Sequence, residues 1–414
     1  MIKSVKYYIL LLLKKYFASY GGVPLAAWQG IIVSFVESTL IGICYFLSLY
    51  FVNNLGIQIH QAGLLISFYG VGTIFGSLAA GKLSDRYSPN KVSIASLFIQ
   101  SFVFYGLIHA QSISTLALLL FMLGIGSYGF ITSNHAWTLA KCRESEAQRL
   151  QAINLLGIAS NLGLGLSAII IGLFSTDRFP IIFSSSSFLL LLTGLYLIVI
   201  EKYQPSNKIV AHAISSCADT LPHKPSHTNT TIIKFTLLCL FLSGIIISQT
   251  NSNYSLYLQQ LFPEMGMKSF SLLFALNTFI VVFLQAPIIT LFNQLNKIIL
   301  IGVGAFLLGL GMLILSFSYI YMIAIFACIV MTLGEILFFS FSQLVCYENV
   351  NEEIKGSGLG LYRMTFAASR IVGPLLGGIV FQKFGGNILW YLCALFGFIC
   401  LIPALHFKKY NPAY

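Results

Sequence analysis

The chain has 414 residues, of which 57% are hydrophobic and only 8% are charged. A soluble globular protein carries about 25% charged residues, so this composition excludes a protein that is surrounded by water alone. The formal net charge is +11, but the basic residues do not cluster on one soluble module, which argues against nucleic-acid binding.

Long apolar segments follow one another along the whole chain. Each has roughly the 17 to 25 residues that a helix needs to cross about 30 Å of hydrocarbon. Because hydrocarbon offers the backbone no hydrogen bonds, we expect transmembrane helices in all of them. The predicted spans are 23–51, 63–80, 92–109, 116–137, 150–174 and 180–200, followed by 232–258, 270–291, 298–317, 320–346, 359–381 and 388–406.

A polar segment divides these twelve predicted helices into two sets of six. Residues 201–231 are rich in Ser, Thr, Asn, Pro and His, which is typical of a flexible linker. A shift along the chain that places 81–91 on 287–297 also superposes the span boundaries of the two sets. We therefore predict an all-α membrane protein with two six-helix bundles, 23–200 and 232–406, and short tails at 1–22 and 407–414. Parallel repeats of this kind bind substrate near the middle of the membrane, between the halves.

The distribution of Lys and Arg predicts an orientation in the membrane. Most of the 23 basic residues lie in the tails, the linker and alternate loops, whereas the opposite loops hold only Arg178, Lys268 and Lys383. This positive-inside pattern places both termini and the linker in the cytoplasm. We expect a multi-pass, monomeric protein of a bacterial cytoplasmic (inner) membrane.

The loop between the second and third segments reads Gly81-Lys-Leu-Ser-Asp85-Arg86-Tyr-Ser-Pro-Asn-Lys91. It resembles the signature loop of the major facilitator superfamily, G-x-L-x-D-R/K-x-G-x-R/K, with Ser88 where that family usually has Gly. The resemblance implies a secondary transporter that works by alternating access. Gly81 permits close helix approach and Asp85, next to Arg86, can contact the N-terminus of a facing helix, which together form a conformational latch.

The tenth and eleventh segments carry a second resemblance. Gly334-Glu335, the loop 351–356 and Gly373-Pro374-Leu-Leu-Gly377-Gly378 resemble the twelve-helix drug–proton antiporter branch of the superfamily. This resemblance implies efflux of a small organic compound in exchange for protons. The fourth segment lacks the Arg that many proton antiporters carry there, because residues 119–124 read Leu-Leu-Phe-Met-Leu-Gly, which leaves the energy source open.

Three charged residues fall near the middle of predicted helices: Glu37 in the first, Glu335 in the tenth and Arg370 in the eleventh. A charge at that depth costs about 2.5 to 3.5 kcal/mol on insertion scales, which argues for a role. One hypothesis is that the carboxyls bind protons or substrate and that Arg370 binds an anionic group. The alternative is a structural ion pair between Glu335 and Arg370. Arg363, two turns away on the same face, is a further candidate that can also extend to the membrane surface.

Several uncharged polar residues are candidates for lining a cavity. Gln249, Asn253 and Asn277 are amides within the seventh and eighth segments, and His135 lies near the inner end of the fourth. An unpaired amide in hydrocarbon is costly, so each amide either faces a polar cavity or bonds a neighbouring helix. His135 either belongs to a proton path or is an interfacial residue.

Three functions remain open from the sequence. The first is proton-coupled efflux of a small organic compound, and the second is transport of an organic anion, such as a metabolite or a siderophore, in either direction. The third is a membrane sensor or assembly partner that does not transport.

An enzyme is not expected, because the sequence holds no nucleophile elbow, HExxH motif or cluster of carboxylates. The eight cysteines form no CxxC pair, so we interpret them as small buried apolar residues rather than disulfides or metal ligands. No cofactor is expected. The predicted partners are the solute, protons and the lipid bilayer.

Overall fold

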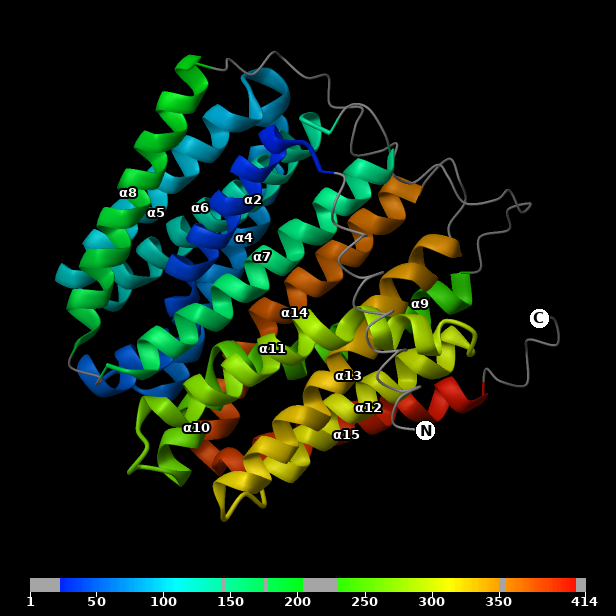
Figure 1. Ribbon diagram of the computed structural model, residues 1–414. Coiled ribbons are helices and arrows are strands. Elements are labelled where there is room, and N and C mark those ends of the chain that lie inside the picture. The colour runs from blue at the N-terminus through cyan, green and yellow to red at the C-terminus, as the bar shows by residue number, and fades with distance from the viewer. Residues whose placement is uncertain (1–22, 143–145, 175–177, 204–229, 350–354, 407–414) are drawn as a thin grey trace, which may run out of the picture.

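A computed structural model describes residues 23–142, 146–174, 178–203, 230–349 and 355–406 (Figure 1). Throughout these ranges the regular elements are helices, and twelve of them are long and apolar enough to cross a membrane. This confirms the predicted all-α membrane fold. The two tails, most of the linker and the loop that follows α13 lie outside the described residues.

The membrane-spanning helices fall into two sets of six. The first set is α2 (Leu25–Ile41) with its continuation to Asn54, α4 (Ile59–Arg86), α5 (Pro89–His109), α6 (Ile113–Ala140), α7 (Glu146–Gly172) and α8 (Phe179–Tyr203). The second set is α9 (Thr230–Ser248), α11 (Met267–Phe292), α12 (Lys297–Leu315), α13 (Tyr321–Glu348), α14 (Lys355–Phe384) and α15 (Gly386–His406). Each set forms its own bundle in Figure 1.

The two bundles repeat one another along the chain. The helices α4, α5 and α6 begin at 59, 89 and 113, and α11, α12 and α13 begin 208 positions later, at 267, 297 and 321. The helix ends are set by local chemistry: the Ser88 hydroxyl caps α5, and the Asn296 side chain caps α12 at the equivalent position. Such caps satisfy backbone N–H groups that the helix itself leaves free.

The first helix of each bundle is broken near its middle. After α2 the chain forms a 3₁₀ turn, Gly42–Phe46, then α3 (Leu47–Leu49) and a wider turn, Tyr50–Asn54. After α9 it forms a 3₁₀ turn, Gln249–Asn251, and then α10 (Asn253–Leu261). The two 3₁₀ turns contact one another across the bundles. Irregular backbone at this depth is tolerated only where protein buries it or where it lines a cavity, so both breaks point to the site.

At one end of the molecule α4 and α14 pack closely across the two bundles. A Cβ atom on Gly63 would collide with the carbonyl oxygen of Pro374, so only glycine permits this approach. The Ser67 hydroxyl donates a hydrogen bond to the carbonyl of Ile371 at 2.7 Å. The other interface between the bundles, α7 against α11, is similarly tight, since a Cβ on Gly172 would lie 2.6 Å from the Ser271 side chain.

Side-chain hydrogen bonds close the same end. The backbone N–H of His60 donates to Oε1 of Gln382 at 2.9 Å, and Nε2 of Gln382 donates to Oε1 of Gln58 at 3.1 Å. Nδ2 of Asn53 donates to Oε1 of Gln259 at 2.7 Å. Every one of these bonds joins the first bundle to the second, so they hold this end shut.

The bundles separate toward the opposite end, which carries the ends of the linker. Among the described residues, no atom lies within 4 Å of the Cβ position of Gly81 on α4, Gly157 on α7 or Gly360 on α14. The helices spread apart on this side in Figure 1. In the predicted orientation this end faces the cytoplasm, and the described conformation is then inward-facing.

Candidate functional site

A cavity of about 390 Å³ lies where the two bundles meet, beside the two broken helices. The first bundle contributes Tyr45, Asn161 and Leu164, and the second contributes side chains of α9 to α11, α13 and α14. The volume falls within the range of about 300 to 1,000 Å³ that is typical of small-molecule sites. The polar lining groups of the second bundle include Thr250, Asn251, Asn277, Gln285, Glu335 and Arg370.

Glu335 projects from α13 toward α11, where an amide holds it. Nδ2 of Asn277 donates to Oε2 of Glu335 at 2.9 Å and to Oγ1 of Thr332 at 2.9 Å. Thr332 and Glu335 are three residues apart on α13, so both face the same neighbour. The Thr332 hydroxyl in turn donates to the carbonyl of Cys328 at 2.7 Å, which fixes its rotamer. The carboxyl is therefore oriented by a neutral donor, and among the described residues no cation pairs with it.

Arg370 projects from α14 toward the first bundle. Nη1 of its guanidinium donates to the hydroxyl of Tyr128 on α6. Cζ lies 5.6 Å from the centre of the Tyr128 ring and 6.0 Å from that of Phe366, which are cation–π distances. This guanidinium is therefore stabilised by aromatic rings and a hydroxyl rather than by a carboxylate.

Glu335 and Arg370 line the same cavity without forming an ion pair. Each is held by a neutral partner, Asn277 for the carboxyl and Tyr128 for the guanidinium. The structural ion pair between Glu335 and Arg370, which the sequence left open as an alternative, is therefore not formed in this conformation. Both charged groups are thus free to contact a solute in the cavity.

Glu37 lies elsewhere, inside the first bundle. Its side chain is 1% exposed and does not line the cavity. The side chains of Gln100 on α5 and of Ser38 lie beside its carboxyl, yet Oε1 of Glu37 and both amide atoms of Gln100 have no hydrogen-bond partner in the described part of the chain. Unpaired buried polar groups cost about 1 to 3 kcal/mol each. This buried cluster is a candidate proton site, and Gln100 was overlooked in the sequence although it is an amide within an apolar span.

The remaining polar candidates divide between the bundle interior and the open end. Nδ2 of Asn253 donates to Oε1 of Gln249 at 2.8 Å, and Nε2 of Gln249 donates to the carbonyl of Gly373 at 3.0 Å. These two amides therefore join the 3₁₀ turn Gln249–Asn251 and α10 to α14, and they do not line the cavity. His135 is half-buried on α6, outside the cavity wall, and Arg363 is exposed on α14 toward the open end.

The signature loop lies at the open end of the first bundle. Asp85 and Arg86 are exposed at the end of α4, and Gly81 has no neighbour within 4 Å of its Cβ position. The close helix approach expected at Gly81 is therefore not made in this conformation. A latch at this position would close only in a different state of the transport cycle.

Aromatic side chains supply much of the remaining cavity wall. The ring centres of Tyr45 and Phe274 are 4.3 Å apart, and those of Phe339 and Phe366 are 5.1 Å apart. Tyr45 belongs to the first bundle and Phe274 to the second, so this pair bridges the bundles next to the cavity. The arrangement favours a solute with an apolar body and a few polar groups.

Comparisons with known proteins agree with this architecture. The sequence model of the Major Facilitator Superfamily matches residues 29–373. Similar curated proteins include the uncharacterized MFS-type transporter YhjO of Bacillus subtilis (strain 168), which is 24% identical over 87% of this chain and 86% of its own length. The uncharacterized MFS-type transporter YqjV of the same organism is 24% identical and covers 86% of each chain.

Solved structures show the same fold at low identity. The peptide transporter POT in complex with sulfate matches with a TM-score of 0.80 and 12% identity over 94% of this chain and 96% of that one. The nucleoside transporter NupG matches with a TM-score of 0.75 and 14% identity over 94% of this chain and 100% of that one.

Proposed function

The chain belongs to the Major Facilitator Superfamily and is a multi-pass membrane transporter rather than an enzyme, and on this premise we propose that it exports a small organic compound in exchange for protons. The solute binds in the central cavity, and alternating access exposes that cavity first to one side of the membrane and then to the other. Among similar solved proteins are transporters of nucleosides and peptides, which are themselves small polar organic solutes.

The observation that carries this proposal is the position of Glu335. Its carboxyl lies in the cavity wall and bonds the amide of Asn277 instead of a cation. An amide N–H can donate to either the ionised or the protonated carboxyl, so the contact holds the group in place in both states. A proton and a polar group of the solute then compete for one carboxyl, and this competition is what an antiporter requires.

Glu37 supplies a second proton site in the same scheme. It is buried away from the cavity and therefore binds no solute, but its surroundings change when α2 and α5 move relative to one another. A ligand shifts a conformational equilibrium only by the difference in its affinity for the two states. A proton on Glu37 therefore favours the conformation in which Glu37 and Gln100 remain buried together.

Flux measurements in proteoliposomes test the coupling. Ethidium and tetraphenylphosphonium serve as amphipathic cations and benzoate as an organic anion, each with and without an imposed pH gradient. We expect the pH gradient to accelerate the flux of a transported probe and Glu335→Gln to abolish that acceleration. Flux that is indifferent to the gradient, or unchanged in Glu335→Gln, would contradict the proposal.

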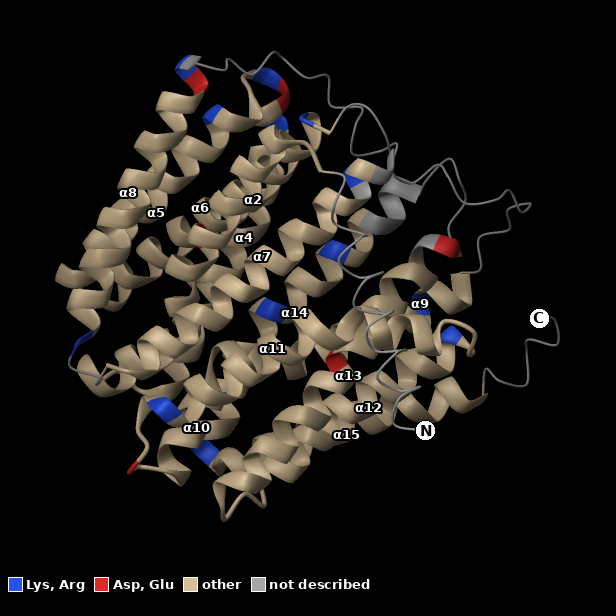
Figure 2. Ribbon diagram, viewed as in Figure 1, with Lys and Arg blue, Asp and Glu red and all other residues tan. Residues whose placement is uncertain are grey.

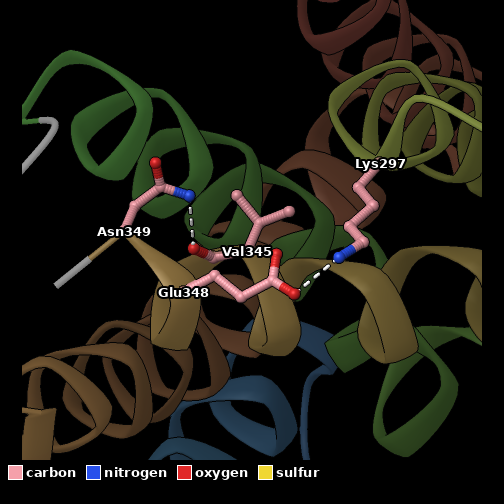
Figure 3. A network of polar contacts seen from close by, with 4 residues as sticks. All are labelled: Lys297, Val345, Glu348 and Asn349. Atoms are coloured by element: carbon pink, nitrogen blue, oxygen red, sulfur yellow. Dashed lines mark hydrogen bonds and ion pairs between the residues drawn. The ribbon is translucent and has the colours of Figure 1, made fainter. Parts of the chain in front are cut away.

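A matched control lies on the same helix. Glu348 of α13 accepts a hydrogen bond from Nζ of Lys297 at 2.5 Å on the surface (Figure 3). Exposed pairs of this kind contribute about 0 to 1 kcal/mol. Glu348→Gln removes one carboxylate from α13, as Glu335→Gln does, and should leave coupled flux within about twofold of the wild type.

Transport of an organic anion is the second candidate, and Arg370 favours it. The guanidinium lines the cavity without a carboxylate partner, so an anionic solute would find an unneutralised charge. Arg370→Gln should then abolish benzoate flux and leave the flux of the two cations unchanged. Retained benzoate flux in that variant would count against an anion as the solute.

A further inference from the structure

A second hollow lies at the linker end of the first bundle, remote from the central cavity. It is an open hollow between α5 and α8 with a volume of about 390 Å³, and its walls are Lys91, Ile94, Ile198, Glu201 and Lys202. It shares no residue with the cavity between the bundles. A ligand here is therefore separate from the transported solute.

The charges in this hollow leave two ammonium groups available. Lys91 follows the start of α5 and Lys202 lies in the last turn of α8, and both are exposed. Within the described residues neither ammonium group forms an ion pair or a hydrogen bond. The carboxylate of Glu201, by contrast, accepts a hydrogen bond from Nδ2 of the buried Asn90 at 2.6 Å. This donor is neutral, so the hollow holds the two ammonium charges together with the negative charge of Glu201. Figure 2 shows other basic positions at this end of the first bundle.

Apolar side chains form the rest of the hollow. Ile94 is buried beneath it, whereas Ile198 is 42% exposed on its rim. Leu195 and Val199 continue the exposed apolar surface along α8. This helix lies at the outer edge of the bundle in Figure 1 and packs mainly on α5. The hollow therefore opens directly onto the lipid-facing surface of the protein.

We propose that this hollow binds an anionic phospholipid, with the phosphate between the ammonium groups of Lys91 and Lys202 and an acyl chain along Ile94 and Ile198. Each Lys near a membrane surface contributes about 1 kcal/mol to attraction of anionic lipid, and basic pockets between transmembrane helices hold such head groups. The two isoleucines favour a lipid over a soluble phosphate, because a soluble phosphate would leave the apolar part of the hollow empty. The bound lipid joins α8 to α5 at the outer edge of the bundle.

Native mass spectrometry of the full chain, released from detergent, tests this proposal. Dioleoylphosphatidylglycerol and dioleoylphosphatidylcholine are added separately to the wild type and to the double variant Lys91→Gln/Lys202→Gln. The wild type should retain phosphatidylglycerol at least fivefold better than phosphatidylcholine, and the double variant should lose this preference. A melting temperature without lipid that matches the wild type shows that the double variant is folded.

The control is the double variant Lys268→Gln/Lys383→Gln, which removes two exposed lysines from the opposite end of the second bundle. It should keep the wild-type preference for phosphatidylglycerol. Equal retention of both lipids by the wild type, or an undiminished preference in Lys91→Gln/Lys202→Gln, would overturn the proposal. Displacement of phosphatidylglycerol by millimolar inorganic phosphate would overturn it as well, because the hollow would then be a site for soluble phosphate.

Discussion

Asn277 of α11 divides its amide between two residues of α13, donating to the carboxyl of Glu335 and to the hydroxyl of Thr332, both at 2.9 Å. Both N–H groups of the amide therefore donate to α13, and one of them orients the carboxyl of Glu335 in the cavity wall. A hydrogen bond to a charged group contributes about 1.5 to 3 kcal/mol, so the orientation of Glu335 depends strongly on this contact.

Asn277→Ala should therefore reduce flux driven by a pH gradient by about tenfold, since about 1.4 kcal/mol corresponds to a factor of ten. The carboxyl remains but loses the donor that positions it. The measurement is probe flux in proteoliposomes with and without the gradient. Asn349→Ala is the control, because Asn349 follows the last residue of α13 and its Nδ2 donates to the carbonyl of Val345 on that helix at 2.9 Å (Figure 3). Equal losses in both variants would show that the effect is general destabilisation of α13.

Glu37→Gln should separate coupling from solute binding. Glu37 does not line the cavity, so the variant should bind a transported probe with wild-type affinity, while acceleration of its flux by a pH gradient is lost. Glu335→Gln should lower both binding and coupling. Probe binding measured by quenching of tryptophan fluorescence, together with flux, distinguishes the two. A loss of probe affinity in Glu37→Gln would argue that Glu37 reaches the cavity in another conformation.

The sequence predicted the twelve helices well, because hydrocarbon requires every spanning segment to be apolar and helical. Their lengths were less predictable: the second helix was expected at 63–80 but runs from Ile59 to Arg86. Hydropathy reports only the part inside the hydrocarbon, and the polar ends continue the helix into the interface. The breaks at Gly42 and Gln249 were not predicted. Residues 42–46 remain apolar, and the polar run at 249–253 was interpreted only as amides that face a cavity or a neighbouring helix. Contacts between the bundles support both breaks.

Part of the candidate site could be predicted from the sequence, because a charged residue stands out within an apolar span. Glu335 and Arg370 attract attention because charges are rare in the spans, whereas Tyr128 is one of 21 tyrosines and carries no such signal. Gln249 and Asn253 illustrate the other difficulty. A buried amide is satisfied equally well by a cavity or by a neighbouring helix, and only the arrangement of helices decides which it meets.

Gln382→Ala should open the closed end of the molecule. Gln382 accepts from the backbone N–H of His60 and donates to Gln58, so the substitution removes bonds that join α14 to the first bundle. Spin labels at His109 and Lys268, near the corresponding ends of α5 and α11, report the separation by pulsed electron resonance. We expect a longer-distance population that the wild type lacks. An unchanged distance distribution would mean that packing of Gly63 on Pro374 is sufficient to hold this end.

Gly81→Leu tests whether the open end must close during transport. No atom of the described part of the chain lies within 4 Å of the Cβ position of Gly81, so the larger side chain should leave the described conformation and its thermal stability unchanged. If α4 approaches the second bundle closely in the other state, the leucine will obstruct that approach, and flux should fall by at least tenfold. The spin-label distance between His109 and Lys268 should then remain short even when a transported probe is present. Gly157→Leu provides the comparison, because Gly157 is equally open at the same end but lies outside the signature loop. Wild-type flux in Gly81→Leu would show that the loop does not act as a latch.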